Sequence, residues 1–220
     1  MPTMEEGQKM IARTAHAWED WLTFMLALIF CELPASEVRA LSWDSIDFTN
    51  DATAIVRRAD RWGRIGQPKS KAGTRTIPFP HAARDASISW RQCCPSSKLS
   101  LVFPSSRGTV QNHSNIMTRY FRLMQIEAGI HIEVGKEGKR TTRKTAKYGL
   151  HALRYFCASL WIEANYSAKR VQTYMNHASI VQTYDTYGHL LDLRDDDKEA
   201  LKRTESRVMN GVNKLLKNAA

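Results

Sequence analysis

Four side chains in the last third of the chain carry chemistry suited to cleavage of a phosphodiester. Arg154 follows His151 by three residues, and a second imidazole, His177, precedes the phenol of Tyr187. A phenol is a weak nucleophile at neutral pH because its ordinary pKa is about 10, so it needs cations or bases nearby. The set predicts a site in which Tyr187 attacks a phosphate held by Arg154 and the two histidines.

Separate structural interpretations exist for each of these side chains. Tyr184 lies three residues before Tyr187 and offers a second phenol. Taken alone, Arg154 fits a salt bridge on a helix surface, and His151 fits a hydrogen-bonded histidine of the core. Because a cation, two imidazoles and a phenol occur together, the catalytic interpretation is favoured over these isolated ones.

The charge of the chain favours a polyanionic partner. Of its 220 residues, 32 are Lys or Arg and 22 are Asp or Glu, which gives a formal net charge of +10. Such an excess disfavours an acidic protein or a neutral small molecule as the main partner, and nucleic acid fits it best. At this length one compact domain is the expectation.

Targeting and redox signals are absent from the sequence as given. The longest apolar run, residues 21–30, is about half the roughly 20 residues of a membrane span, so it predicts a buried helix and no membrane partner. The N-terminus lacks an export signal, and the expected location is cytoplasmic. The four cysteines have neither Cys-x-x-Cys nor zinc-ligand spacing, which argues against a disulfide framework and against a metal site.

Local patterns predict a mostly helical chain with a few strands. Helical spacing of apolar residues and helix borders indicate five helices outside the region from His151 to Tyr187, over residues 10–33, 36–43, 81–93, 112–128 and 195–218. A break is expected at 44–50, and β-branched runs at 54–56 and 74–78 predict strands joined through a turn or loop at 62–68. The last helix has an apolar stripe at Leu201, Val208, Val212 and Leu215, which requires a docking partner.

Residues 132–147 are rich in Gly, Lys and Arg and have no apolar period, which predicts a loop. Two interpretations stay open for it: a solvated surface connection, or a segment that contacts DNA phosphates.

With these segments in order, the chain resembles the catalytic domain of tyrosine recombinases, the phage-integrase family, over about residues 3–190. Residues 35–47 resemble the first conserved box of that family, 71–78 its β-hairpin lysine segment and 151–190 its second box. The resemblance implies an α+β, mostly helical fold with a small antiparallel three-stranded sheet on one edge. It also implies double-stranded DNA as the partner.

In that family a tyrosine attacks the scissile phosphate, forms a 3′-phosphotyrosyl link and frees a 5′-hydroxyl, so no metal, ATP or other cofactor is required. The resemblance makes Tyr187 the nucleophile, because the run Asp-Thr-Tyr-Gly-His-Leu matches the family motif, and Tyr184 is then expected to pack. Lys71 becomes the general acid for the leaving oxygen, with Lys69 as its competitor.

The remaining roles follow in the same way. Arg154 becomes one of two arginines that hold the non-bridging oxygens of the phosphate, a task that suits the paired donors of a guanidinium. His151 and His177 become the residues that bind the phosphate and handle protons. Contacts with DNA are expected from six basic residues: Lys69, Arg75, Lys139, Arg140, Arg143 and Lys144.

The first box departs from the family pattern at the other arginine. The family reads Thr-Gly-Leu-Arg where this chain reads Cys-Glu-Leu-Pro, so Pro34 occupies the position of the first catalytic arginine and Glu32 that of a glycine. Proline has no charge and no side-chain donor. By analogy with loss of one oxyanion donor, cleavage should fall by at least about 10²–10³. The negative charge of Glu32 near a phosphate is a second unfavourable change.

No substitute arginine is evident in the sequence. Arg39 lies five residues after Pro34, which places it about 140° around a helix and predicts that it points elsewhere. Arg57, Arg58 or Arg64 remain candidates from the sheet. Two milder departures, Tyr155 after Arg154 and Asn176 before His177, replace a usual His and Gly; Asn tolerates a left-handed backbone, so the turn at 176 should persist.

The domain and function hypotheses follow from these points. We expect a catalytic domain over residues 1–190, a C-terminal helix over 191–220, and no counterpart of the N-terminal core-binding domain of the family. The chain is either a DNA recombinase with impaired cleavage or a catalytically silent DNA-binding remnant. In a third hypothesis, the C-terminal helix is exchanged between protomers for self-association on DNA, the alternative being that it folds back on its own domain.

Overall fold

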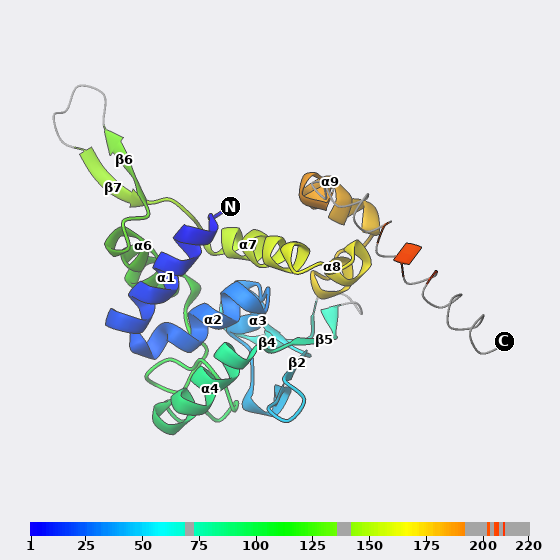
Figure 1. Cartoon of the computed structure of the whole chain (residues 1–220). Helices are drawn as coiled ribbons and strands as arrows, with labels where there is room; N and C mark the ends of the chain where they lie inside the picture. Colours follow the sequence, from blue (N-terminus) through cyan, green and yellow to red (C-terminus); the bar gives the residue numbers. More distant parts are fainter. Residues whose placement is uncertain (69–72, 136–141, 192–201, 203–204, 207–208, 210–220) are drawn as a thin grey trace.

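The N-terminal third is helical, as expected, but is divided into shorter helices. In the computed structural model, which describes residues 1–68, 73–135, 142–191, 202, 205–206 and 209, α1 spans Met4–Ala17 and α2 spans Leu22–Phe30 (Figure 1). The single helix predicted over 10–33 is therefore wrong. The break falls at Trp18, whose indole Nε1 donates to Glu127 over 3.1 Å and whose ring packs edge-on against Tyr120. A tertiary contact thus ends α1 without proline or glycine.

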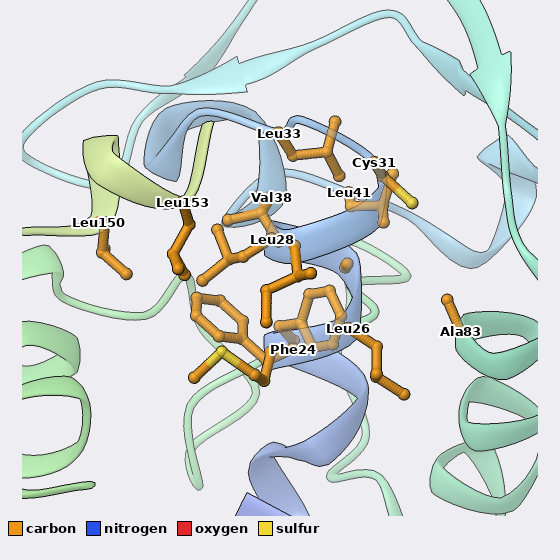
Figure 2. Close-up of a cluster of buried hydrophobic side chains, with 14 of the residues drawn as sticks. Phe24, Leu26, Leu28, Cys31, Leu33, Val38, Leu41, Ala83, Leu150 and Leu153 are labelled. Atoms are coloured by element: carbon orange, nitrogen blue, oxygen red, sulfur yellow. The ribbon is translucent and has the colours of Figure 1, made fainter. Parts of the chain in front are cut away.

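Helix α2 is the centre of the core. Its residues from Thr23 to Ile29 are all buried, because neighbouring elements cover every side of it. It contacts α1, α4 (His81–Cys93) and α7 (Leu150–Glu163). Figure 2 shows Phe24 and Leu28 of α2 among side chains contributed by the other elements. Each such large side chain stabilises the fold by about 1.5–3 kcal/mol on burial.

The predicted three-stranded antiparallel sheet is present. It consists of β1 (Ile46–Asp47), β2 (Ala52–Ile55) and β5 (Arg75–Pro78), in the order β1-β2-β5. Thr53 pairs with Ile77, and both are buried, so one face of the sheet packs on the core. The strand β1 falls inside the break expected at 44–50.

Two smaller hairpins were not predicted as strands. The first joins β3 (Arg58–Ala59) to β4 (Ile65–Gly66). The strand β4 falls inside the turn or loop expected at 62–68, and β3 lies before it. The second joins β6 (His131–Gly135) to β7 (Thr142–Ala146) and projects from the body of the molecule (Figure 1). The loop predicted over 132–147 is therefore wrong. Its residues are mostly exposed on both faces of the hairpin, so no apolar alternation marks the strands.

The helices of the second half agree better with the sequence patterns. The helix α4 has the predicted bounds, and the helix predicted over 112–128 consists of α5 (His113–Asn115), a π-helical segment (Ile116–Phe121) and α6 (Arg122–Glu127). The short helix predicted over 36–43 is reduced to α3 (Ala35–Val38). No described helix is long and apolar enough to cross a membrane.

The chain then ends its described part with α8 (Ala168–Tyr174) and α9 (Ile180–Leu191), which pack on each other and on α7. The helix predicted over 195–218, with its apolar stripe, lies almost wholly outside the described residues.

Candidate active site

A cavity of about 320 Å³ brings the start of α7 next to the start of α3. Two of the predicted site residues, His151 and Arg154, line it, and Pro34 lines it from the other side. The remaining lining residues are Leu33, Ala35, His113, Met117, Gly149 and Leu150. Pro34, at the position where the family pattern has its first arginine, therefore lines the same cavity as Arg154.

His113 also lines the cavity, although no sequence motif indicates it. It is exposed at the start of α5, and partial burial together with the nearby charge of Arg39 lowers its pKa. It lies outside every motif, and the fold places it in the cavity with His151 and Arg154.

The guanidinium of Arg154 is held on two sides. Its Nε lies 2.5 Å from Oε1 of Glu32, and its Nη2 donates to the carbonyl oxygen of Met175. The side chain is 16% exposed, which excludes the surface salt bridge considered from the sequence. Arg154 is thus paired with a buried carboxylate while part of it still faces the cavity.

Arg75 lies on the opposite side of the same carboxylate. Its Nη2 is 3.3 Å from Oε2 of Glu32 and 2.9 Å from Oε2 of Glu37, and its Nε donates to the carbonyl oxygen of Tyr174 over 2.7 Å. Its side chain is only 4% exposed. The structure therefore places Arg75, expected among the residues that contact DNA, inside the protein, where it shares Glu32 with Arg154.

Glu32 is the most unusual residue of the site. It is fully buried, and its φ of 55° lies in the left-handed region that favours glycine. Burial raises the pKa of its carboxyl to about 8, although the charges of Arg154 and Arg75 act in the opposite direction. The sequence indicated a negative charge near the phosphate, but it did not indicate that this charge would bridge two arginines.

Tyr187 is buried behind Arg154. It is 1% exposed, its hydroxyl points at Sδ of Met175 over 3.9 Å, and its ring is nearly parallel to that of His177, with centroids 6.2 Å apart. Burial raises the pKa of its phenol well above the ordinary value, whereas the charge of Arg154 lowers it. Met175 therefore links the two groups, because its carbonyl accepts from Arg154 and its sulfur lies against the phenol.

The histidines are both near Arg154 and differ in exposure. His151 is exposed, which excludes the core histidine considered from the sequence, and its ring lies edge-on to that of Tyr155. His177 is half-buried and its Nδ1 hydrogen-bonds with the hydroxyl of Thr183 over 2.9 Å. Burial, followed by the charge of Arg154, lowers the pKa of both imidazoles. They are therefore mostly neutral at pH 7, able to accept or relay a proton.

Two expectations about the backbone and the second tyrosine can be compared with the structure. Asn176 has a φ of 53°, so the left-handed turn before His177 is confirmed. Tyr184 is 50% exposed, so the expectation that it packs is wrong. On α9 the positions of 184 and 187 place one tyrosine outward and the other against α7 and α8.

The candidate replacements for the missing arginine are engaged elsewhere. Arg39 donates to the carbonyl oxygens of Gln111 and Asp60 and does not line the cavity. Arg57 donates to the carbonyl oxygens of Ala40 and Leu99, and Arg58 to that of Gln67. Arg64 is exposed at the turn between β3 and β4 and does not line the cavity.

The remaining predicted residues fall into two groups. Lys69, Lys71, Lys139 and Arg140 lie outside the described residues. Arg143 and Lys144 are exposed on β7, where Lys144 pairs across the hairpin with Glu133. In the described part of the chain, no three His, Cys, Asp or Glu side chains are grouped so as to hold a metal ion.

The fold agrees with comparisons to known proteins. Residues 4–194 match the Phage integrase family, so the chain belongs to this family of tyrosine recombinases. No curated protein matches the chain.

Solved structures of the same architecture support the assignment of the fold. The Tn1549 transposon integrase in complex with transposon right end DNA is 16% identical with a TM-score of 0.70, over 92% of this chain and 65% of that one. XerA recombinase is 16% identical with a TM-score of 0.64, over 94% and 64%. A lambda integrase tetramer bound to a Holliday junction is 17% identical with a TM-score of 0.54, over 84% and 47%. The chain thus spans less than two thirds of the length of each of these proteins.

Proposed function

We propose that this chain is the catalytic domain of a DNA strand transferase that cleaves and rejoins DNA through Tyr187. The observation that carries the proposal is the convergence of His151 and Arg154 on one cavity, with Tyr187 linked to Arg154 through Met175 and His177 stacked on Tyr187. A backbone phosphate in the cavity would meet one guanidinium and two exposed imidazoles, those of His113 and His151. DNA is a polyanion, which suits the net charge of +10 of this chain.

The proposed reaction is a transesterification. The oxygen of Tyr187 forms a bond to phosphorus while the bond to the 5′ oxygen breaks, and the leaving oxygen takes up a proton. We assign that proton to Lys71, from the resemblance of its segment to the family pattern. Arg154 stabilises the negative charge that develops on the non-bridging oxygens. His177, stacked on the phenol, is suited to accept its proton because its own pKa is lowered.

Cleavage requires a rearrangement of α9. The phenol of Tyr187 is 1% exposed and is directed at a methionine sulfur, so it cannot reach a phosphate in the cavity from this position. Movement of α9 relative to α7 and α8 would release it. We therefore propose that DNA binding stabilises a second position of α9.

Cleavage should also be slow, because Pro34 leaves one phosphate clamp empty. The described alternatives, Arg39, Arg57 and Arg58, are bound to backbone carbonyls and cannot replace it without loss of those hydrogen bonds. This supports the second candidate function, a DNA-binding protein of the same family that no longer cuts.

A nicked suicide duplex distinguishes the two candidates. Such a substrate loses the short 5′-hydroxyl fragment after attack, so a covalent adduct accumulates and is detected as a shift on a denaturing gel. The strand-transferase proposal requires an adduct that is lost in Tyr187→Phe and kept in Tyr184→Phe. Retained duplex binding with no adduct from the wild-type protein over long incubation would leave the DNA-binding function alone.

Self-association on DNA through the C-terminal helix is a further part of the proposal. It is supported by the apolar stripe at 201–215 in the sequence and by the lambda integrase, which forms a tetramer on its Holliday junction. Light scattering of the whole chain and of a chain ending at residue 194, each with and without duplex DNA, tests it. An unchanged mass in all four samples would exclude the helix as the element of assembly.

A further inference from the structure

We propose that Glu32 is an internal counter-anion that competes with the DNA phosphate for Arg154. The inference rests on the phosphate site proposed above and adds a residue that controls the affinity of that site. A phosphate and a carboxylate bind a guanidinium in the same way, through parallel N–H donors, so the two cannot share the same edge of Arg154.

The contacts of Arg154 show how the competition arises. Oε1 of Glu32 takes Nε, and the carbonyl oxygen of Met175 takes Nη2. These two nitrogens form one edge of the guanidinium, and a bidentate phosphate would need either this edge or the pair of Nη atoms. With both contacts kept, the Nε–Nη2 edge is closed to a phosphate, and three of the five N–H groups remain, two on Nη1 and one on Nη2, so a phosphate must bind at the Nη1–Nη2 edge.

The charges of the cluster give the same result. Arg75 and Arg154 contribute two positive charges, and Glu32 and Glu37 contribute two negative charges when ionised. The cluster is then neutral and offers no net attraction to a phosphate. Loss of the charge on Glu32 alone leaves a net charge of +1 directly behind the cavity.

The backbone supports a specific role for this side chain. Residue 32 has a φ of 55°, a conformation in which glycine is unstrained and glutamate is not. A buried carboxylate at such a position goes against the backbone preference and also incurs the cost of desolvation. The same conformation makes Glu32→Gly a variant that the fold should accept.

The competition should depend on pH, because burial raises the pKa of Glu32 to about 8. The ionisable groups around it are Arg75 on β5, Glu37 on α3, Arg154 and Cys157 on α7, the adjacent Cys31, and Tyr187 on α9. Burial raises the pKa of both thiols and of the phenol, so Glu32 is the member of this group expected to titrate between pH 7 and 9. Competition is therefore weak at pH 7 and strong at pH 9.

Fluorescence anisotropy with a labelled duplex tests the proposal without any need for cleavage. At pH 9 and fixed salt, Glu32→Gln and Glu32→Gly should each bind the duplex about tenfold more tightly than wild type, as expected for removal of one partly screened charge near the phosphate. At pH 7 the gain should be clearly smaller. Glu163→Gln is the matched control, because it removes one negative charge from an exposed position on α7, and it should change binding less than twofold.

An Arg154→Ala background locates the effect. If Glu32 acts through Arg154, the gain from Glu32→Gln disappears in that background. A gain of the same size with and without Arg154, or binding by both Glu32 variants within twofold of wild type at pH 9, would overturn the proposal. Circular dichroism and a melting curve establish that each variant is folded, and Glu32→Gly provides the result if Glu32→Gln is not.

The outcomes also separate this proposal from the proposed function. Tighter binding through Arg154 without any covalent adduct would support the role of Glu32 and refute strand transfer. An adduct from the wild type, with no effect of either Glu32 variant on binding, would do the opposite.

Discussion

Restoration of an arginine at position 34 is the most direct test of the site. The structure favours a tolerated substitution, because Pro34 is partly exposed and its φ of −56° and ψ of 150° are open to arginine. The carbonyl of Pro34, which accepts from the backbone N–H groups of Glu37 and Val38, is unaffected by the side chain. Loss of the rigid proline should cost about 0.4–1 kcal/mol of unfolding free energy.

The expected gain in catalysis follows from where the new side chain would lie. Pro34 lines the same cavity of about 320 Å³ as His151 and Arg154, so an arginine at 34 would supply a second guanidinium to a phosphate bound there. One preorganised donor is worth about 2.7–4 kcal/mol of transition-state stabilisation, or about 10²–10³ in rate. Pro34→Arg should therefore form the Tyr187 adduct at least about a hundredfold faster than wild type.

The assay is single-turnover adduct formation on the nicked suicide duplex at saturating protein, which separates the chemical step from binding. Pro34→Met is the matched control, since it also removes the proline and adds a long side chain but no charge. If Pro34→Arg and Pro34→Met form adduct at the same rate while both bind the duplex, the missing guanidinium is not the cause of slow cleavage. The reasoning about position 34 would then be refuted.

Three further predictions concern stability and binding. The pKa of Glu32 is raised in the folded state to about 8, so its contribution to stability is full below its ordinary pKa and is lost as pH rises through 8. The unfolding free energy of wild type, measured by urea titration, should therefore fall by up to about 5 kcal/mol between pH 4.5 and 9. An equal fall in Glu32→Gln would exclude this assignment. Arg75→Met removes the cation that pairs with the buried carboxylate of Glu37 and leaves Glu32 with Arg154 alone, so it should lower the unfolding free energy by about 3–5 kcal/mol; a melting temperature equal to wild type would contradict the buried ion pairs. Double replacement of Arg143 and Lys144 by Gln should reduce the slope of log affinity against log salt by about 2. The control variant Lys98→Gln changes an exposed residue elsewhere and should leave the slope unchanged. Equal slopes for wild type and both variants would exclude β7 from the DNA interface.

The sequence was sufficient wherever a local pattern and its tertiary environment agree. The apolar spacing of 81–93 defines α4 with its observed bounds, since its amphipathic face packs on α2. The asparagine at 176 indicated a left-handed turn, and the turn is present. In both cases the residues of the pattern themselves determine the local conformation.

The errors occur where distant contacts or solvent determine the structure. The break of the first helix depends on the contact between Trp18 and Glu127, which are more than a hundred residues apart. The hairpin β6–β7 is exposed on both faces and so lacks the alternation by which a strand is recognised. The exposure of Tyr184 and the burial of Tyr187 depend on which face of α9 packs against α7 and α8, and the sequence around the two tyrosines does not specify that face.

The two unusual residues of the first box lie in one short turn, and their effects on the phosphate site have the same direction. Between α2 and α3, Glu32 adds a negative charge behind Arg154, and Pro34 omits a positive charge in front of it. In a site with an arginine at position 34, that second positive charge would balance the charge of Glu32, and Arg75 would remain to pair with Glu37. With proline at 34, ionised Glu32 instead neutralises Arg154, the cation that lines the cavity in the described part of the chain. Because both residues act on the same guanidinium, their effects on DNA binding and cleavage should not be additive. The attraction of this site for a phosphate is therefore a property of the turn as a whole rather than of Arg154 alone.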